Sequence, residues 1–371
     1  MHARLAARRV DVASFKRAAE QLLQEDFFSC ADDTFALRHI PITAGAFPLG
    51  EERELTGYIV ACHRLIADDE IRTLLLFAAM CVLEDISYTR KDGQYLRWDG
   101  RSGRTRAKKA LNKGYISLFR EAVRAKLRQM TADLSIESSQ LRLFTDDADI
   151  SSVSYTPELL QGSSLDILPS LLPDSYDFVL TSPPYANRYD YTRTYALELV
   201  FLGCDDEEVK RLRQTMLSCT VENKEKREYL RRLYITLGRE RDFTRVEEAF
   251  ADCAALHEVL DALENYRKLG ALNNDNIVRL VRNYFYEMCF VIYEFARLLR
   301  PGGTIAMVND NVRYAGEEVP VDLILSSMAE SFGLYAQHIW TLGRGKGNSS
   351  QQMGTHGRSE LRKCVYVWQK R

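Results

Sequence analysis

The sequence lacks the features that mark membrane and exported proteins. Its 371 residues contain no uninterrupted apolar run approaching the roughly 18 residues that a membrane-spanning helix needs. Residues 1–10 include arginines but no apolar core of the kind that secretory signals carry. We therefore expect a cytoplasmic protein without a membrane segment.

Paired cysteines are also absent. The eight cysteines stand singly, with no C-x-x-C pair and no histidine at a spacing typical of zinc ligands. Several of them, including Cys81 and Cys289, lie in apolar stretches, where a buried structural thiol is expected. We therefore predict neither a metal site nor a disulfide framework, a pattern typical of a reducing compartment.

Net charge is low as well. The chain has 50 Lys and Arg residues against 52 Asp and Glu residues, a formal charge of −2, which as an average argues against a nucleic-acid partner. Residues 87–128, however, contain 13 basic residues and three acidic ones, interleaved with Tyr88, Tyr95, Trp98 and Tyr115. This basic segment is suited to binding phosphates, and the alternative interpretation is a solvated helix face. The total therefore does not exclude DNA.

The remaining composition indicates a folded protein whose first 139 residues are helical. A hydrophobic fraction of 46% excludes a disordered chain, and the length allows one large domain or two to three ordinary ones. Apolar spacing predicts helices over 55–86, with a break near Asp68, and over 106–134. Residues 87–103 between them indicate a polar, glycine-bearing loop rather than a strand.

From about residue 140 the pattern changes to that of an α/β domain, which we place at 140–371. Short apolar runs alternate with turn residues and helices, as parallel sheets require. The predicted elements are a short buried strand at 177–180, a charged and helix-prone insert at about 204–274, a helix at 277–299, a strand at 304–308, and a closing strand pair at 338–342 and 364–368.

The sharpest motif follows the first of these strands. Thr181 leads into Ser182, Pro183, Pro184 and Tyr185, at the carboxyl end of a predicted parallel strand. Ligands bind at that end in doubly wound sheets. Because two prolines fix the backbone and donate no hydrogen bond, the turn presents carbonyl oxygens and one hydroxyl, followed by an aromatic ring.

These groups suit methylation of an exocyclic amine on a nucleobase. The amine lone pair is delocalised into the ring, so acceptors on its N–H bonds favour a pyramidal nitrogen that attacks a sulfonium methyl group. Ser182 and the Pro183 carbonyl are the candidate acceptors, and Tyr185 is the candidate stacking partner of a base flipped out of the duplex. The alternative is a Ser-Pro-Pro loop that only ends a strand.

The motif resembles that of the DNA amino-methyltransferases, specifically the cytosine-N4 group with S-P-P-Y, whereas adenine-N6 relatives more often carry D or N in the first place. The resemblance implies a class I (Rossmann-like) α/β methyltransferase sheet, S-adenosylmethionine as cofactor, double-stranded DNA as substrate, and a role in restriction–modification or phage defence. It covers about residues 55–371, and similar segments lie at 87–99, 176–180, 186–191, 197–199, 299–303, 348–353 and 363–370.

One family feature is missing. The cofactor loop D-P-F-x-G-S-G-T is absent, and no segment of residues 1–150 offers a buried strand opening onto a glycine turn and a helix. Around Gly162 the chain resembles the family segment beside the cofactor adenine, although Ser163 stands where an acidic residue is common. The resemblance therefore implies cofactor contacts at Gly162, Ser163 and Thr181 only.

Two explanations follow from this absence. In the first, which we favour, the enzyme is split and a second chain donates the missing strands and glycine loop. That arrangement predicts an unusually large apolar surface near Gly162 and Thr181. In the second, the protein is a non-catalytic DNA-binding specificity or scaffold subunit. An adenine-N6 enzyme and an RNA amine methyltransferase are the further alternatives.

Candidate nucleic-acid contacts lie in the basic segment, after the motif and in a late glycine-rich loop. The loop at 343–347 lacks the spacing of a phosphate-binding loop, so we interpret it as a loop near the base or backbone. Residues 309–311 end a strand and are candidates for lining the pocket, or simple turn residues. The candidate contacts are Arg90, Lys91, Arg97, Arg101, Arg104, Arg106, Lys108, Lys109, Arg188, Arg344 and Lys346.

Overall fold

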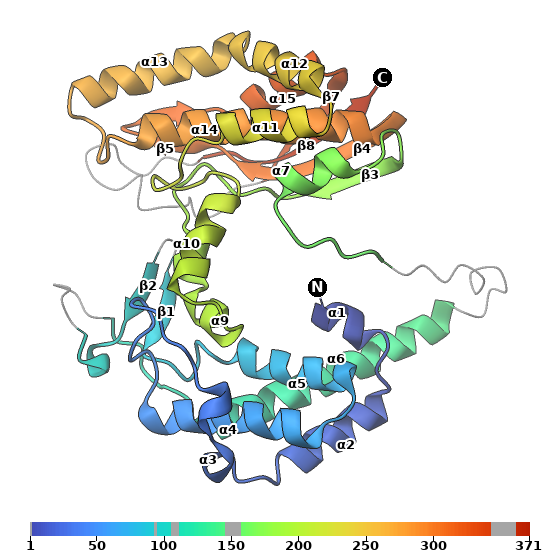
Figure 1. Ribbon diagram of the computed structural model, residues 1–371, viewed down its shortest axis with the longest axis vertical. Helices are drawn as coiled ribbons and strands as arrows, with labels where there is room; N and C mark the ends of the chain where they lie inside the picture. The colour runs from blue at the N-terminus through green and yellow to red at the C-terminus, as the bar shows by residue number, and fades with distance from the viewer. Residues whose placement is uncertain (1, 93–94, 105–110, 145–156, 343–360) are drawn as a thin grey trace. The chain divides into compact units, whose positions relative to one another are not determined.

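The computed structural model describes residues 2–92, 95–104, 111–144, 157–342 and 361–371 (Figure 1). The chain divides into two compact units. The N-terminal unit comprises residues 1–159 and 191–210, and the C-terminal unit comprises residues 160–190 and 211–371. None of the helices within the described ranges combines the length and the hydropathy needed to cross a membrane.

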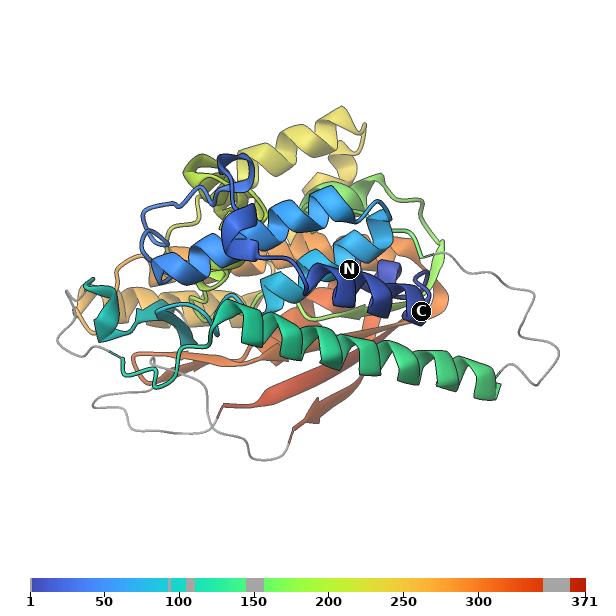
Figure 2. The ribbon, with the colours of Figure 1, turned by 90° about the horizontal axis from the view of Figure 1, so that it is seen from below.

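The N-terminal unit is a helical bundle with one β-hairpin. Its core includes the mutually packed rings of Phe27, Tyr58 and Phe119, whose centroids lie 5.2–6.1 Å apart in edge-to-face geometry. Figure 2 shows the long helix α6 beside α5. The elements are α1 (His2–Ala7), α2 (Val12–Leu22), α3 (Phe27–Cys30), α4 (Leu49–Leu65), α5 (Asp69–Cys81), β1 (Thr89–Asp92), β2 (Tyr95–Trp98), α6 (Phe119–Phe144), α8 (Tyr191–Thr194) and α9 (Ala196–Phe201), with short 3₁₀ turns at Asp33–Phe35 and Gly100–Ser102.

The predicted helix break at Asp68 is confirmed. Asp68 is the N-cap of α5, and its carboxylate accepts hydrogen bonds from the backbone N–H groups of Glu70 and Ile71. The start of the helix predicted over 106–134 lies outside the described residues, and the prediction is wrong for residues 111–118, since α6 begins at Phe119. Gly114 adopts a left-handed φ of 74° before it, and the backbone N–H of Phe119 donates to Glu51 at 2.6 Å.

The loop predicted at 87–103 is also wrong in part. Strands β1 and β2 form an antiparallel hairpin there, in which Arg90 lies opposite Arg97 and Thr89 opposite Trp98. Asp92 belongs to β1, and a glycine between two short runs that contain Tyr88, Tyr95 and Trp98 is a hairpin signal as well as a loop signal.

The C-terminal unit is an α/β layer built on a four-stranded sheet in the order β3-β4-β8-β7 (Figure 1). Strands β3 and β4 are parallel, whereas β8 is antiparallel to β4 and to β7. The elements are α7 (Ser164–Ile167), a 3₁₀ turn (Leu168–Ser170), β3 (Tyr176–Thr181), α11 (Arg227–Thr236), α12 (Glu240–Ala251), α13 (Ala254–Lys268), α14 (Ile277–Leu298), β4 (Leu299–Asp310), β5 (Val312–Tyr314), β6 (Glu317–Val319), α15 (Val321–Ser331), β7 (Leu334–Thr341) and β8 (Lys363–Lys370), and α10 (Asp206–Thr215) crosses the boundary between the units.

All four predicted strands of this unit and the predicted helix at 277–299 are confirmed as elements. The burial predicted for the first strand is wrong. Tyr176, Phe178 and Leu180 of β3 are exposed, with 72% of the surface of Leu180 accessible, because α14 and α15 pack against the opposite face of the sheet.

Helix α14 is the centre of this unit, and 19 of its 22 residues are buried. A helix that is apolar on all sides is enclosed by its neighbours, and α7, α12, α13, α15 and β4 all pack against it. Two of its buried residues are nonetheless carboxylates. Glu294 accepts from Tyr234 and Arg239, both at 2.7 Å, and from Arg297 at 2.6 Å.

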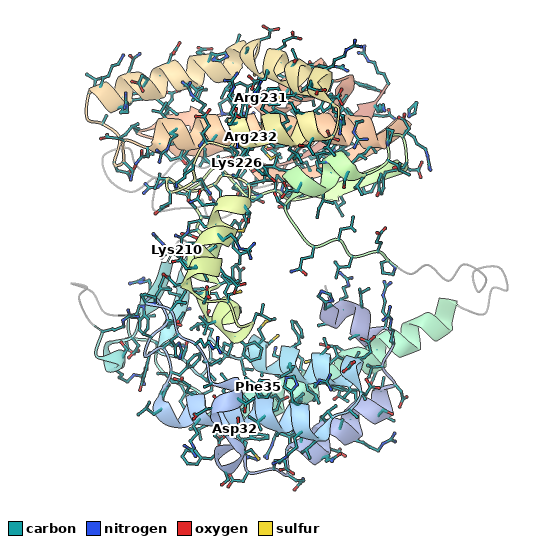
Figure 3. All side chains as sticks on the ribbon, in the orientation of Figure 1. Asp32, Phe35, Lys210, Lys226, Arg231 and Arg232 are labelled. Carbon is teal, nitrogen blue, oxygen red and sulfur yellow. The ribbon has the colours of Figure 1, made fainter. Side chains whose placement is uncertain are left out.

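The second buried carboxylate, Glu287, is held by the insert. The Lys226 ammonium, labelled in Figure 3, lies 2.8 and 2.9 Å from the two carboxylate oxygens, and the Ser218 backbone N–H donates at 2.8 Å. Burial raises the pKa of Glu287, while Lys226 and Ser218 act in the opposite direction. This pair ties the segment before α11 to the central helix.

Replacing Lys226 with Met leaves the Glu287 carboxylate buried without its cation. We expect the free energy of unfolding near pH 8 to fall by about 3–5 kcal/mol. Removing Lys226 raises the pKa of Glu287 further, and a carboxyl group whose pKa is higher in the folded state stabilises the fold below its unfolded pKa and loses that contribution as pH rises. The loss should therefore be smaller near pH 5, and urea unfolding at both pH values measures it.

Arg232 provides the matched control, because its ion pair with Glu228 at 2.9 Å is exposed (Figure 3). Arg232→Met should change the free energy of unfolding by less than about 0.5 kcal/mol. The double variant Lys226→Met with Glu287→Leu should recover most of the loss. Equal effects of Lys226→Met and Arg232→Met would contradict the assignment.

Candidate active site and nucleic-acid surface

The sequence-predicted turn at residues 182–185 begins where β3 ends. Thr181, the last residue of β3, lies opposite Met307 in the parallel register with β4. Ser182 is exposed and Pro183 is buried, so the backbone is anchored while the hydroxyl is accessible. The hydroxyl oxygens of Ser182 and Tyr185 lie 3.5 Å apart. The turn therefore brings the predicted acceptor and the predicted stacking residue together.

Contacts after the turn fix its exit. The buried Tyr314 hydroxyl donates to the carbonyl oxygen of Ala186, and the Asn187 side chain accepts from the Tyr189 backbone N–H at 3.1 Å. Arg188 has a left-handed φ of 67°, which is uncommon for a residue with a Cβ, and its guanidinium donates to Asn273 at 2.9 Å. Arg188, a predicted nucleic-acid contact, thus also has a structural partner.

A buried ion pair completes this anchoring. Arg213 lies 3.1 Å from the carboxylate of Asp190, which is almost fully buried. The Cys219 thiol donates to the carbonyl oxygen of Tyr189 at 3.3 Å. Sequence reasoning missed Asp190, Arg213 and Tyr314 as supports of the turn. Asp190 lies in the family-like segment 186–191 but was given no role, and Arg213 and Tyr314 belong to no motif and reach the turn only through the fold.

Asn309 and Asp310 are the last two residues of β4, and Asn311 follows directly. Asn309 donates to the Tyr284 hydroxyl at 2.7 Å, and Asn311 donates to Glu318 at 2.9 Å, so both amides are engaged within the fold. Asp310 differs from them. Burial raises the pKa of its carboxyl group, and the Lys363 ammonium, 4.0 Å away, opposes that rise.

The predicted cofactor contacts near residue 162 lie at the start of α7. Ser163 is the N-cap of this short helix, and its hydroxyl accepts from the Leu165 backbone N–H at 3.3 Å. A Cβ on Gly162 would approach the Ile167 side chain to 3.0 Å. Both residues therefore have local structural reasons for their identity, and their cofactor role stays a prediction.

The β1–β2 hairpin carries the clearest cationic feature of the basic segment. Arg90 and Arg97 are directly opposite each other in the antiparallel register, and both are exposed. The hairpin therefore places two exposed cationic side chains at one cross-strand position.

Other basic residues of the segment are engaged inside the N-terminal unit. Arg101 binds Asp99 through two hydrogen bonds of 2.8 and 3.0 Å, which hold the pKa of Asp99 far below its usual range. Arg104 lies over the Trp98 ring at 4.5 Å, and Lys91 forms an ion pair with Glu198. Of the other predicted contacts, Arg106, Lys108, Lys109, Arg344 and Lys346 lie outside the described residues.

Comparison with known proteins places this geometry in context. The chain is 44% identical over 334 residues to the Type II methyltransferase M.AvaI of a Nostoc species and of Anabaena variabilis. It is 41% identical over 345 residues to the Type II methyltransferase M.BsoBI of Geobacillus stearothermophilus. No protein-family model and no solved structure matches it.

Each of these alignments covers 90% of this chain and 66% of the relative. The chain thus spans slightly less than two thirds of the length of the curated relatives it matches. Over most of its own length, the chain is homologous to Type II methyltransferases.

Proposed function

We propose that the chain methylates an exocyclic base amine in double-stranded DNA, with S-adenosylmethionine as the methyl donor and cytosine N4 as the preferred target. The 182–185 turn at the end of β3, in a chain homologous to Type II methyltransferases, carries this proposal. The serine in the first position of the turn favours cytosine over adenine N6, by the resemblance described above. The names of the relatives support a role in restriction–modification or phage defence.

The chain's own residues act on the acceptor side of the reaction. The Ser182 hydroxyl and the Pro183 carbonyl accept hydrogen bonds from the target amine and so draw its lone pair out of conjugation with the ring. The Tyr185 ring stacks on the flipped base and holds it at the turn. S-adenosylmethionine supplies an electrophilic methyl group when bound, and the amine proton is lost to one of the acceptors or to water.

The described residues include more groups suited to binding the target base than groups suited to binding the cofactor. The Ser163 hydroxyl caps α7 by accepting a backbone hydrogen bond, and the sequence has no D-P-F-x-G-S-G-T loop. The order β3-β4-β8-β7, with β8 antiparallel, supports our proposal that this sheet is the closing half of a class I methyltransferase sheet. We therefore propose a split enzyme in which a second polypeptide carries the cofactor loop.

DNA binding is the task we propose for the basic segment. The opposed Arg90 and Arg97 side chains form a site for backbone phosphate, because two exposed cationic side chains at one cross-strand position attract it. Contacts of this kind position the duplex without reading its sequence.

Replacing Ser182 with Ala removes one acceptor for the target amine. We expect methyl transfer to fall about 100-fold, as it does when a single preorganised hydrogen-bonding group is removed from other active sites. Tyr185→Ala should cost roughly 10-fold through lost stacking. Transfer of radiolabelled methyl groups to duplex DNA, by this chain with the polypeptide that carries the cofactor loop, measures both effects.

Ser170→Ala is the matched control, because Ser170 is exposed in the same unit and its hydroxyl donates only to the Ile167 carbonyl. It should leave activity unchanged. Mass analysis of digested DNA should show N4-methylcytosine, and N6-methyladenine would reverse the assigned target. If the mixture methylates DNA equally well with and without the changes at Ser182 and Tyr185, the chain is a scaffold subunit. If methyl transfer to structured RNA exceeds transfer to duplex DNA, DNA is rejected as the substrate.

Replacing Arg90 and Arg97 together with Gln should weaken DNA binding for all sequences. Two lost phosphate contacts should lower the slope of log affinity against log salt by about two. Fluorescence anisotropy with a labelled duplex at several salt concentrations measures the slope. The control is Arg231→Gln with Arg232→Gln, two exposed arginines of α11 (Figure 3), and equal slopes for both double variants would refute the phosphate site.

A further inference from the structure

One face of the four-stranded sheet is buried and the other is open. Ile305, Met307, Tyr366 and Trp368 on the first face are fully buried, and α14 and α15 pack against these strands. The second face, which we call the open face, carries mostly apolar side chains that are exposed or half-buried. They are Phe178 and Leu180 of β3, Ala306 and Val308 of β4, Val365 and Val367 of β8, and Trp340 of β7.

The strand register makes this face continuous. Leu180 lies opposite Ala306, which lies opposite Val367, and Val308 lies opposite Val365, which lies opposite Trp340. Residues paired in register point to the same side of a sheet. Phe178, Leu180 and Trp340 are 55%, 72% and 57% exposed, so the apolar surface extends across all four strands.

Strand β3 also has an unpaired edge among the described residues. Proteins protect such edges with lysine, proline, a bulge or a covering element. Within β3 there is neither lysine nor proline, and its one charged residue, Asp177, binds Arg300 at 2.7 Å. The register with β4 shifts between Tyr176 and Phe178, and residues 178–181 are then paired regularly. The edge is therefore open to an added strand at the position where the 182–185 turn begins.

We propose that the β3 edge and the open face together bind a polypeptide outside this chain, which adds a strand beside β3 and covers the open face with helices. The solvent-facing side of a sheet that contains antiparallel strands normally carries polar residues, so the mostly apolar side chains of the open face indicate a surface that a partner covers. About a third of the length of each curated relative lies outside the match, which is sufficient for several strands and helices.

This inference deepens the proposed function in one respect, because it assigns the cofactor loop to that polypeptide. A strand added parallel to β3 ends next to Thr181 and Ser182. A glycine-rich loop that follows such a strand then lies beside the candidate acceptor groups. Docking supplies both the missing cover of the sheet and the missing half of the site.

The binding experiment uses the full chain and, as the probe, the part of M.AvaI outside the matched 334 residues, produced as a separate polypeptide. We expect a one-to-one complex in size-exclusion chromatography, without cofactor or DNA. Leu180→Asp should weaken it at least about 10-fold in titration calorimetry, since it places a charge within the apolar contact. Amide hydrogens of β3 should exchange more slowly in the complex.

Leu269→Asp is the matched control, because Leu269 is an exposed leucine of the same unit at the end of α13, and it should leave affinity unchanged. Ser182→Ala should bind normally although its methyl transfer falls about 100-fold, which separates failure of docking from failure of the catalytic assignment. Slow exchange of α14 amides in each variant confirms that the unit is folded.

Three results would overturn the proposal. The first is the absence of a complex with the probe, or equal affinity of Leu180→Asp and Leu269→Asp. The second is slow exchange of β3 amides in the isolated chain, which would show that the chain's own helices cover the sheet. The third is self-association that Leu180→Asp abolishes and the probe does not displace, which would assign the surface to a second copy.

Discussion

Backbone hydrogen bonds between β3 and β4 hold the 182–185 turn at the end of the sheet, and each feature of the candidate site depends on that pairing. The parallel register sets Thr181 opposite Met307 and so determines where Ser182 emerges. Strand β4 is in turn positioned by α14, which precedes it directly and is buried on nearly every side. The position of the exposed Ser182 hydroxyl therefore depends on the most deeply buried elements of the unit.

Much of this architecture could be predicted from sequence. The strand at 177–180, the helix at 277–299 and the closing strand pair have apolar patterns of distinct length, and each formed where its pattern placed it. The burial of β3 could not be predicted in the same way. A run of apolar residues predicts that a strand will be covered, but it does not reveal whether the covering residues belong to the same chain.

The candidate site was likewise predictable only in part. Ser182 and Tyr185 are adjacent in sequence, and a short rigid motif keeps its geometry wherever it occurs, so their proximity was predictable. The supports at Tyr314 and Arg213 come from distant segments and follow from tertiary packing alone. The hairpin of β1 and β2 was missed because a glycine is typical of both loops and tight turns.

The exposed edge of β3 has a consequence for how such a protein is produced in a cell. An unpaired strand that carries Phe178 and Leu180 on its surface is a template for association with other chains, so an excess of this polypeptide is prone to aggregation. In the split enzyme proposed above, balanced synthesis of the two polypeptides would limit this aggregation. The amount of active enzyme would then be set by the scarcer polypeptide.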